Sequence, residues 1–504
     1  MLVAAVLLTP VHQAKAFSIL GSKATWMTGS IGYQAGETGG PMYLGDGYRW
    51  NVPVLTYAFD DSFLTYFGSN GVAAVESAIK VLNSITNADA MSDDLAEYPT
   101  YTLRHNNTAS ALGLIDVKTV ALSYLLERIG VGAPERWVWS IRQFFTDPAN
   151  IQHFSVLNLN YDPETWHQTA FINGTQFTYQ VQRYLPGDNY TTVNYPMDAA
   201  APAFTTAAYF WQAFQGIAAQ GGILAGAPGT YFPNITREEV AAIKYLYRSK
   251  NYAVETVLPD VVGGSITGLP VGTPGTSTGS SGGSTADETW TPTYQVAVGG
   301  GSSSSPWSVI VSTGGTNTTT TGTTTTVGTT NSTTFVGTAL RPGIGKVTFA
   351  RIGWDSVLAS TTRPYAVTWT DRYITNGVIR SQKLSRSITR PDFIFSATDI
   401  GTVNHIPLTY AHATTGDGYV NNSAVNRVGG AGEQQGPGII NTGNEFSFSK
   451  VGRFYLNDDG VGTTEDQGTL DISFGSFDGS TNAIIAYPDG ASIRALEAQV
   501  LRSR

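Results

Sequence analysis

The chain has 504 residues, a formal net charge of −9, 13% charged residues and no cysteine. The lack of cysteine excludes disulfides, thiolate nucleophiles and cysteine-ligated metal centres. The negative charge argues against a nucleic-acid partner, because such partners require a basic face and no basic cluster is visible along the sequence. At this length we expect two domains, each able to bury its own core.

Residues 1–16 are predicted to be a signal peptide. Leu2 to Leu8 form a short apolar run, and Ala14-Lys15-Ala16 before Phe17 fits a cleavage site of the small-x-small type. The basic residues that usually precede such an apolar run are absent. No stretch of the chain is long and apolar enough for a membrane-spanning helix. The sequence therefore predicts an extracellular or cell-surface protein without a membrane span.

Residues 17–258 combine helical and strand patterns. Val54–Phe59 is predicted to be a strand, and a helix is expected from about Gly71 to Asn83, where apolar side chains recur at helical spacing. A second helix is expected from Asp116 to Ile129. Asp116 suits its N-cap, and Gly130 suits its end.

Residues 259–335 are rich in Gly, Ser and Thr, and no Lys or Arg occurs between Lys250 and Arg341. Such a segment has too little apolar surface to offset its chain entropy, so it is predicted to be a flexible or extended linker. Two short apolar islands, Trp290–Val298 and Trp307–Val311, are possible strands within it.

Residues 336–504 are predicted to form a β-rich domain that ends in a short helix from 491. Period-two alternation separated by Gly, Asn, Asp and Pro is typical of antiparallel sheets, and a β-sandwich-like architecture is expected. The alternating runs are Lys346–Arg351, Tyr365–Thr370, Phe393–Phe395, Glu445–Ser449 and Leu470–Phe474.

The second helix resembles the active-site helix of the metzincin zinc peptidases. In their pattern H-E-x-x-H-x-x-G-x-x-H, three histidines hold zinc and the glutamate is the general base. Only Gly130 matches that pattern. Ser123, Glu127 and Ala133 stand at the three ligand positions, and Tyr124 stands at the base. Because a site without imidazoles cannot hold zinc in this way, the resemblance implies a metzincin-like fold over residues 17–258 that lacks the zinc site.

The order of elements is similar to that of the matrixin subgroup, over roughly residues 50–250. The resemblance includes a closing helix of the type L-S-x-D-D-x-x-x-I-x-x-L-Y, which matches Ile235 to Tyr247 with conservative exchanges. Thr236 and Glu239 form a capping box at its start. Met197 is the only methionine available for the methionine turn of the family, and an insertion must separate Gly130 from the closing helix.

Other candidate sites are weak. No two histidines are four residues apart, so surface or hydrogen-bonded roles are favoured over metal binding for His105, His153, His167, His405 and His412. Asn457–Gly460 with Glu465 and Asp466 could supply oxygen ligands to calcium, but Tyr455 occupies the first position of an EF-hand frame. An exposed acidic turn is the simpler interpretation. Asp60-Asp61 and Asp93-Asp94 are expected to be helix-capping or surface residues.

Two G-x-S-x-G strings, around Ser277 and Ser281, lie in the linker and are discarded as nucleophile elbows. Paired carboxylates of the glycosidase type stay open, because the fold sets their separation. The N-x-S/T pattern of glycan attachment occurs at Asn173, Asn189, Asn234, Asn317 and Asn331.

We therefore predict no catalytic residue, no cofactor and no metal ligand, and we lean against an enzyme. The leading hypothesis is a secreted or surface-displayed structural or binding protein built on a peptidase-like scaffold, a pseudoenzyme. Its possible partners are a second copy of itself or a cell-surface polymer, and not nucleic acid. The alternative is an extracellular hydrolase, metallopeptidase-like, with a non-standard site.

Overall fold

The computed structural model describes residues 15–21, 26–33, 40–44, 47–184, 189–198, 204–208, 228–258, 261–263, 335–336, 338–375, 377–399, 410–413, 419–420, 438–440, 444–455, 467–479 and 482–503. Most of the predicted signal peptide, both islands of the linker and the calcium-type loop lie outside these residues. The described residues form a mixed α/β structure with few helices and many strands.

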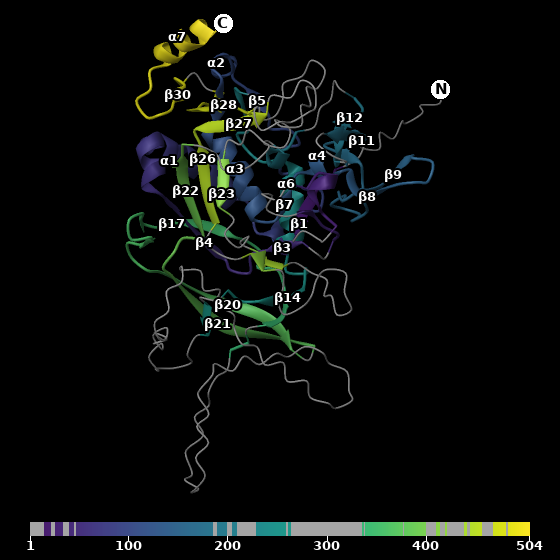
Figure 1. The fold of residues 1–504 in the computed structure, drawn as a ribbon. Helices are drawn as coiled ribbons and strands as arrows, with labels where there is room; N and C mark the ends of the chain where they lie inside the picture. The colour runs from purple at the N-terminus through teal and green to yellow at the C-terminus, as the bar shows by residue number, and fades with distance from the viewer. Residues whose placement is uncertain are drawn as a thin grey trace, which may run out of the picture.

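A five-stranded sheet lies at the centre, in the order β17-β4-β22-β26-β23. Its strands are β17 (Thr348–Arg351), β4 (Val54–Phe59), β22 (Phe393–Thr398), β26 (Asn444–Ser449) and β23 (Tyr410–Ala413). The first four run parallel to one another, and β23 is antiparallel at the edge. Figure 1 shows β22, β26 and β23 side by side, with α1 next to them.

This pairing corrects two predictions. The strands of 336–504 were expected to be antiparallel and to belong to a domain separate from 17–258. Instead, β17 and β22 flank β4 on both sides in parallel register. Parallel strands need cover on both faces, which helices and a second sheet provide here. Period-two alternation is more common in antiparallel sheets, but what it reports is which residues face a core, and it fixes neither the strand direction nor the partner strand.

One face of the central sheet is lined with phenylalanines and covered by α1 (Asp61–Ser84) and α3 (Val117–Arg128). Phe63 and Phe67 of α1 pack on Phe448 at ring distances of 5.6 and 5.0 Å. The predicted helix 71–83 begins ten residues earlier, because Asp60 caps it through Ser62 and the helix continues across a kink at Gly68, where φ is 57°.

A second five-stranded sheet, antiparallel throughout, has the order β14-β16-β20-β21-β15. Its strands are β14 (Ala253–Thr256), β16 (Thr338–Arg341), β20 (Tyr365–Thr375), β21 (Val378–Ile388) and β15 (Val261–Gly263). In Figure 1 it lies below the central sheet. The predicted linker 259–335 therefore starts and ends within one sheet and does not connect two separate sheets.

Apolar packing and buried ion pairs join the two sheets. Ala58 of β4, Ile388 of β21 and Ile352 form a small core between them. In the same region, the Arg386 guanidinium donates to both carboxylate oxygens of Asp392, at 3.0 and 2.6 Å. Asp392 also accepts from the backbone N–H of Thr56 in β4 at 2.7 Å.

A second buried network links the N-terminal half to β14, β16 and β20. Arg49 is fully buried and donates from Nε to Glu255 at 2.8 Å. Arg341, 2% exposed, donates from Nε to Asp371 at 3.1 Å and from Nη2 to the carbonyl of Val336 at 2.7 Å. These charges are desolvated but paired, so the network requires all of its partners.

The remaining elements are mostly short. They are β1 (Ser18–Gly21), η1 (Gly29–Ile31), β2 (Gly40–Pro41), β3 (Tyr48–Arg49), η2 (Ala88–Ala90), β5 (Arg104–His105), α2 (Asn107–Ala111), β6 (Leu114–Asp116), β7 (Val131–Gly132), α4 (Pro134–Trp137), β8 (Ser140–Thr146), β9 (Gln152–Leu157), β10 (Phe171–Ile172), β11 (Thr175–Tyr184), β12 (Asn189–Pro196), η3 (Thr206–Ala208), β13 (Thr230–Tyr231), α6 (Arg237–Tyr247), β18 (Trp354–Asp355), β19 (Ser360–Thr361), β24 (Tyr419–Val420), β25 (Gly438–Ile440), β27 (Val451–Tyr455), β28 (Gln467–Asp471), β29 (Ser473–Ser476), β30 (Ile485–Ala486) and α7 (Ile493–Ser503). Four of these elements, β6, β7, β29 and η3, pack against α3. Among the described helices, none is long and apolar enough to cross a membrane.

The residues at the predicted cleavage site are buried. Lys15 is 5% exposed, and its Nζ lies 2.8 Å from Oε1 of Glu164. Ala16 is fully buried in a small cluster with Val138, Ile172 and Phe177. Cleavage after Ala16 would remove both contacts.

Shortening the linker is expected to leave the fold intact. The register of β15 and β16 in their sheet places Gly263 and Thr338 roughly 25–30 Å apart. A spacer of about 12 Gly and Ser residues in place of 266–333 can span that distance. Because a shorter loop costs less closure entropy, stability should be unchanged or about 1–2 kcal/mol higher. Urea unfolding of both proteins checks this, and loss of cooperative unfolding in the shortened chain would contradict it.

Candidate functional site

The helix that resembles a zinc-peptidase helix is α3, and its predicted ends are confirmed to within one residue. Asp116 is its N-cap and accepts from the N–H of Thr119 at 2.9 Å. Gly130 follows it with φ of 92°, and a Cβ there would lie 2.2 Å from the carbonyl oxygen of Tyr48. Only glycine fits this position, so the local backbone geometry is enough to explain why Gly130 is a glycine.

The side chains at the positions that align with the zinc ligands and the base of the metzincin pattern are largely packed into the core. Ser123 is 2% exposed, Tyr124 is fully buried and Ala133 is 6% exposed. The Tyr124 ring lies 4.3 Å from that of Phe446 in β26. Glu127 is half-buried. The face that carries the base in a peptidase is therefore occupied here by aromatic packing against the central sheet.

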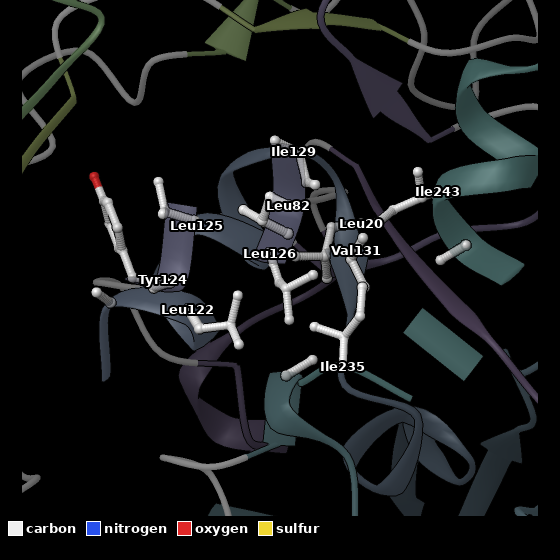
Figure 2. Packing of buried hydrophobic residues seen from close by; sticks show 14 of the residues in the cluster. Leu20, Leu82, Leu122, Tyr124, Leu125, Leu126, Ile129, Val131, Ile235 and Ile243 are labelled. Carbon is white, nitrogen blue, oxygen red and sulfur yellow. The ribbon is translucent and has the colours of Figure 1, made fainter. Parts of the chain in front are cut away.

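The other side of α3 is equally filled. Figure 2 shows Leu122 and Leu126 gathered with Val131 and Ile235, while Tyr124 points the other way. All four aliphatic side chains are at most 1% exposed. A helix that is apolar on all sides is a core helix, and it presents no wall to a substrate cleft.

The closing helix α6 confirms the predicted capping box, in which Thr236 Oγ1 donates to Glu239 at 2.7 Å. Its Tyr247 hydroxyl donates to the carbonyl of Ile129 at 2.9 Å and so fixes the end of α3. Met197, the candidate for a methionine turn, follows β12 and is 63% exposed.

The described histidines occupy separate elements. His105 lies in β5 and is 3.0 Å from Oδ1 of Asn107, and His153 lies in β9 and is 3.0 Å from Oδ2 of Asp147. His405 lies outside the described residues. Within the part of the chain that the structure describes, no three His, Asp or Glu side chains are arranged to hold a metal ion.

The acidic pairs have the roles expected of them. Asp60 caps α1, and the fully exposed Asp93 side chain pairs with Lys244 at 3.1 Å. Among the glycan patterns, Asn173 is unsuitable in the folded chain, because its side-chain nitrogen is buried in the turn between β10 and β11.

A group that the sequence did not reveal consists of three buried carboxyls, Glu135 of α4 and Glu238 and Glu239 of α6. They are 4%, 1% and 0% exposed. Each accepts hydrogen bonds from one of two neighbouring segments, the turn at Asn173 or residues 204–208. Glu135 accepts from the Thr205 hydroxyl at 2.8 Å, and Glu239 accepts from the N–H of Ala207 at 2.9 Å. Glu238 accepts from the N–H of Asn173 at 3.0 Å.

Burial dominates the electrostatics of this group. Desolvation raises the pKa of Glu135 and that of Glu238 to about 8, and the neighbouring carboxyls add to the effect. The pKa of Glu239 is raised as well, against the hydrogen bonds from Thr236. Strongly shifted acids often mark functional sites, but these three are closed to solvent and hold backbone N–H groups. Their arrangement fits the fastening of the 173 and 204–208 segments to α6.

Sequence reasoning reached Glu239 through the capping box and missed the other two. Adjacent glutamates in the first turn of a helix are usually exposed, and their negative charge interacts favourably with the helix dipole. Only the position of α4 and of residues 204–208 shows that this turn is buried.

Comparisons with known proteins identify no relative of this chain. No family model, no curated protein and no solved structure matches it.

Proposed function

We propose that the chain is a non-catalytic structural or binding protein, secreted or displayed at the cell surface, on a body that resembles a metzincin peptidase without its zinc site. The observation that carries this proposal is the burial of Ser123, Tyr124 and Ala133. A catalytic helix must present its reactive groups to an open cleft, whereas here the base position packs at 4.3 Å on Phe446.

The position of α3 also supports a structural role. The helix lies between α1, the central sheet and η3, so it contributes to the main apolar core. Such a core stabilises a large chain that contains no cysteine and therefore no disulfide.

The alternative, an extracellular hydrolase, would need an acid or base reachable from solvent. Three carboxyls whose pKa burial raises, Glu135, Glu238 and Glu239, are at most 4% exposed and accept hydrogen bonds from neighbouring segments of the chain. Their raised pKa values follow from burial, and no substrate can approach them in this fold.

Metal analysis and an activity assay on the purified full chain test the proposal. We expect sub-stoichiometric zinc after dialysis against zinc-containing buffer, and no cleavage of casein or of a general peptide library. Stoichiometric zinc together with chelator-sensitive cleavage would overturn the non-catalytic assignment.

A further inference from the structure

The β20–β21 hairpin concentrates positive charge in an otherwise acidic protein. Residues 363–390 contain six basic residues and one acidic residue, whereas the whole chain has a net charge of −9. The acid, Asp371, is buried and paired with Arg341, and Arg386 is buried and paired with Asp392. Five exposed cations are left: Arg363, Arg372, Arg380, Lys383 and Arg390.

Strand register brings two of these cations together. Thr370 pairs with Lys383 and Arg372 pairs with Ser381, so Arg372 and Lys383 are diagonal neighbours on one face. The Cα atoms of such diagonal neighbours are roughly 7–8 Å apart, and their Cβ atoms are somewhat closer. Within the described part of the chain, neither side chain forms an ion pair or a hydrogen bond. Their charges are thus available to a partner.

The rest of that face is flat and carries hydroxyls. Exposed positions alternate along β20 from Ala366 to Arg372, and along β21 the alternation holds from Ser381 onward. Val378 to Ser381 are all exposed, and Ile379 lies on the same face as Ser381. The exposed set is Ala366, Thr368, Thr370, Arg372, Ser381, Lys383 and Ser387. The face contains no acid, and the aromatic residues Tyr365, Trp369 and Tyr373 occupy the opposite side of the sheet.

We infer that this basic hydroxyl face, defined by the residues just given, binds an extended acidic polysaccharide. An extended strand pair of eleven residues presents roughly 35 Å of surface, which suits a linear polymer. Arginine and lysine form charge-assisted hydrogen bonds to carboxylate or sulfate groups, and threonine and serine hydroxyls can hydrogen-bond to sugar oxygens. Single-stranded nucleic acid is disfavoured, because the face offers no aromatic ring on which bases could stack.

Binding assays on the full chain test this inference with alginate and dextran sulfate as probes and neutral dextran as the uncharged comparison. We expect both anionic polymers to bind and neutral dextran not to bind. Affinity should fall at least about tenfold between 50 and 200 mM salt, because the attraction is electrostatic. The double variant R372Q/K383Q should lose at least about tenfold in affinity while its melting temperature stays unchanged.

The matched control is K80Q/K250Q, which removes two exposed lysines outside the hairpin. It should bind as the parent chain does. Equal losses in the two double variants, unchanged affinity in R372Q/K383Q, or no binding to either anionic polymer at 50 mM salt would overturn the inference. So would tighter binding to duplex DNA or to phosphatidylserine vesicles than to the polysaccharides.

This inference rests on the proposed binding role, and the two fail separately. If the protein binds no zinc, cleaves no peptide and binds neither anionic polymer, the proposed function stands and only the polysaccharide inference fails. Zinc-dependent cleavage would overturn the proposed function whether or not the polymers bind.

Discussion

Replacing Arg341 by methionine is expected to lower the free energy of unfolding by about 3–5 kcal/mol, because it leaves a buried carboxylate without its cation. Arg341 holds Asp371 with two nitrogens, at 3.1 and 3.2 Å, and Asp371 is only 7% exposed. After the replacement, Asp371 still accepts the 2.8 Å hydrogen bond from Gln382, but its ion pair with residue 341 is lost.

Urea unfolding of three variants separates charge from packing. Arg372→Met replaces the exposed arginine that follows Asp371 in β20. Its free energy of unfolding should stay within about 0.5 kcal/mol of that of the parent. The double variant R341M/D371L removes both charges and should regain much of the loss, since a buried pair can be replaced by apolar side chains. Equal stability of R341M and the parent would show that the network contributes little.

Stability is expected to fall as the pH rises from about 4.5 to about 8. The pKa values of Glu135 and Glu238 are raised from 4.5 to about 8, so the folded chain binds protons in this range that the unfolded chain releases. Each group then contributes a slope of about −1.4 kcal/mol per pH unit. The stabilisation is fully present below about pH 4.5 and is lost above about pH 8. Burial also raises the pKa of Asp116 to about 6 and that of Glu255 to about 7, which steepens the lower part of the range.

The variant Glu238→Gln isolates one of these groups. Glutamine is neutral at every pH and can still accept the hydrogen bond from the N–H of Asn173. Its slope between pH 5 and pH 8 should be shallower by about 1.4 kcal/mol per pH unit, and at pH 8 it should be more stable than the parent. The same exchange at the exposed Glu497 is the control and should leave the slope unchanged. A parent slope retained in Glu238→Gln would refute the assignment.

Local patterns predicted the helices and several strands well. The strand Val54–Phe59 is confirmed at both ends, and α3 and α6 begin at the predicted caps Asp116 and Thr236. Caps and helix stops are decided by neighbouring residues, which explains the accuracy. Helix α1 was predicted too short because Gly68 breaks the periodic pattern without ending the helix.

Strand partners could not be predicted in the same way. The alternation in Phe393–Phe395 indicated a strand, but its parallel neighbours are β4, more than 330 residues earlier, and β26. The basic hydroxyl face was missed for a related reason. Arg372 and Lys383 are eleven residues apart, and only the register of the β20–β21 hairpin makes them neighbours.

Residue identities and local patterns were enough to predict the caps of α3 and α6, the lack of cysteine chemistry and the lack of histidines at positions 123, 127 and 133. Each of these depends on residue identity or on neighbours within one or two helical turns. Three features became visible only in the folded chain: the burial of α3 in the core, the pairing of the C-terminal strands with β4, and the joint burial of three glutamates. These features depend on contacts between distant segments, whose free energy comes from burial and is not encoded in local periodicity.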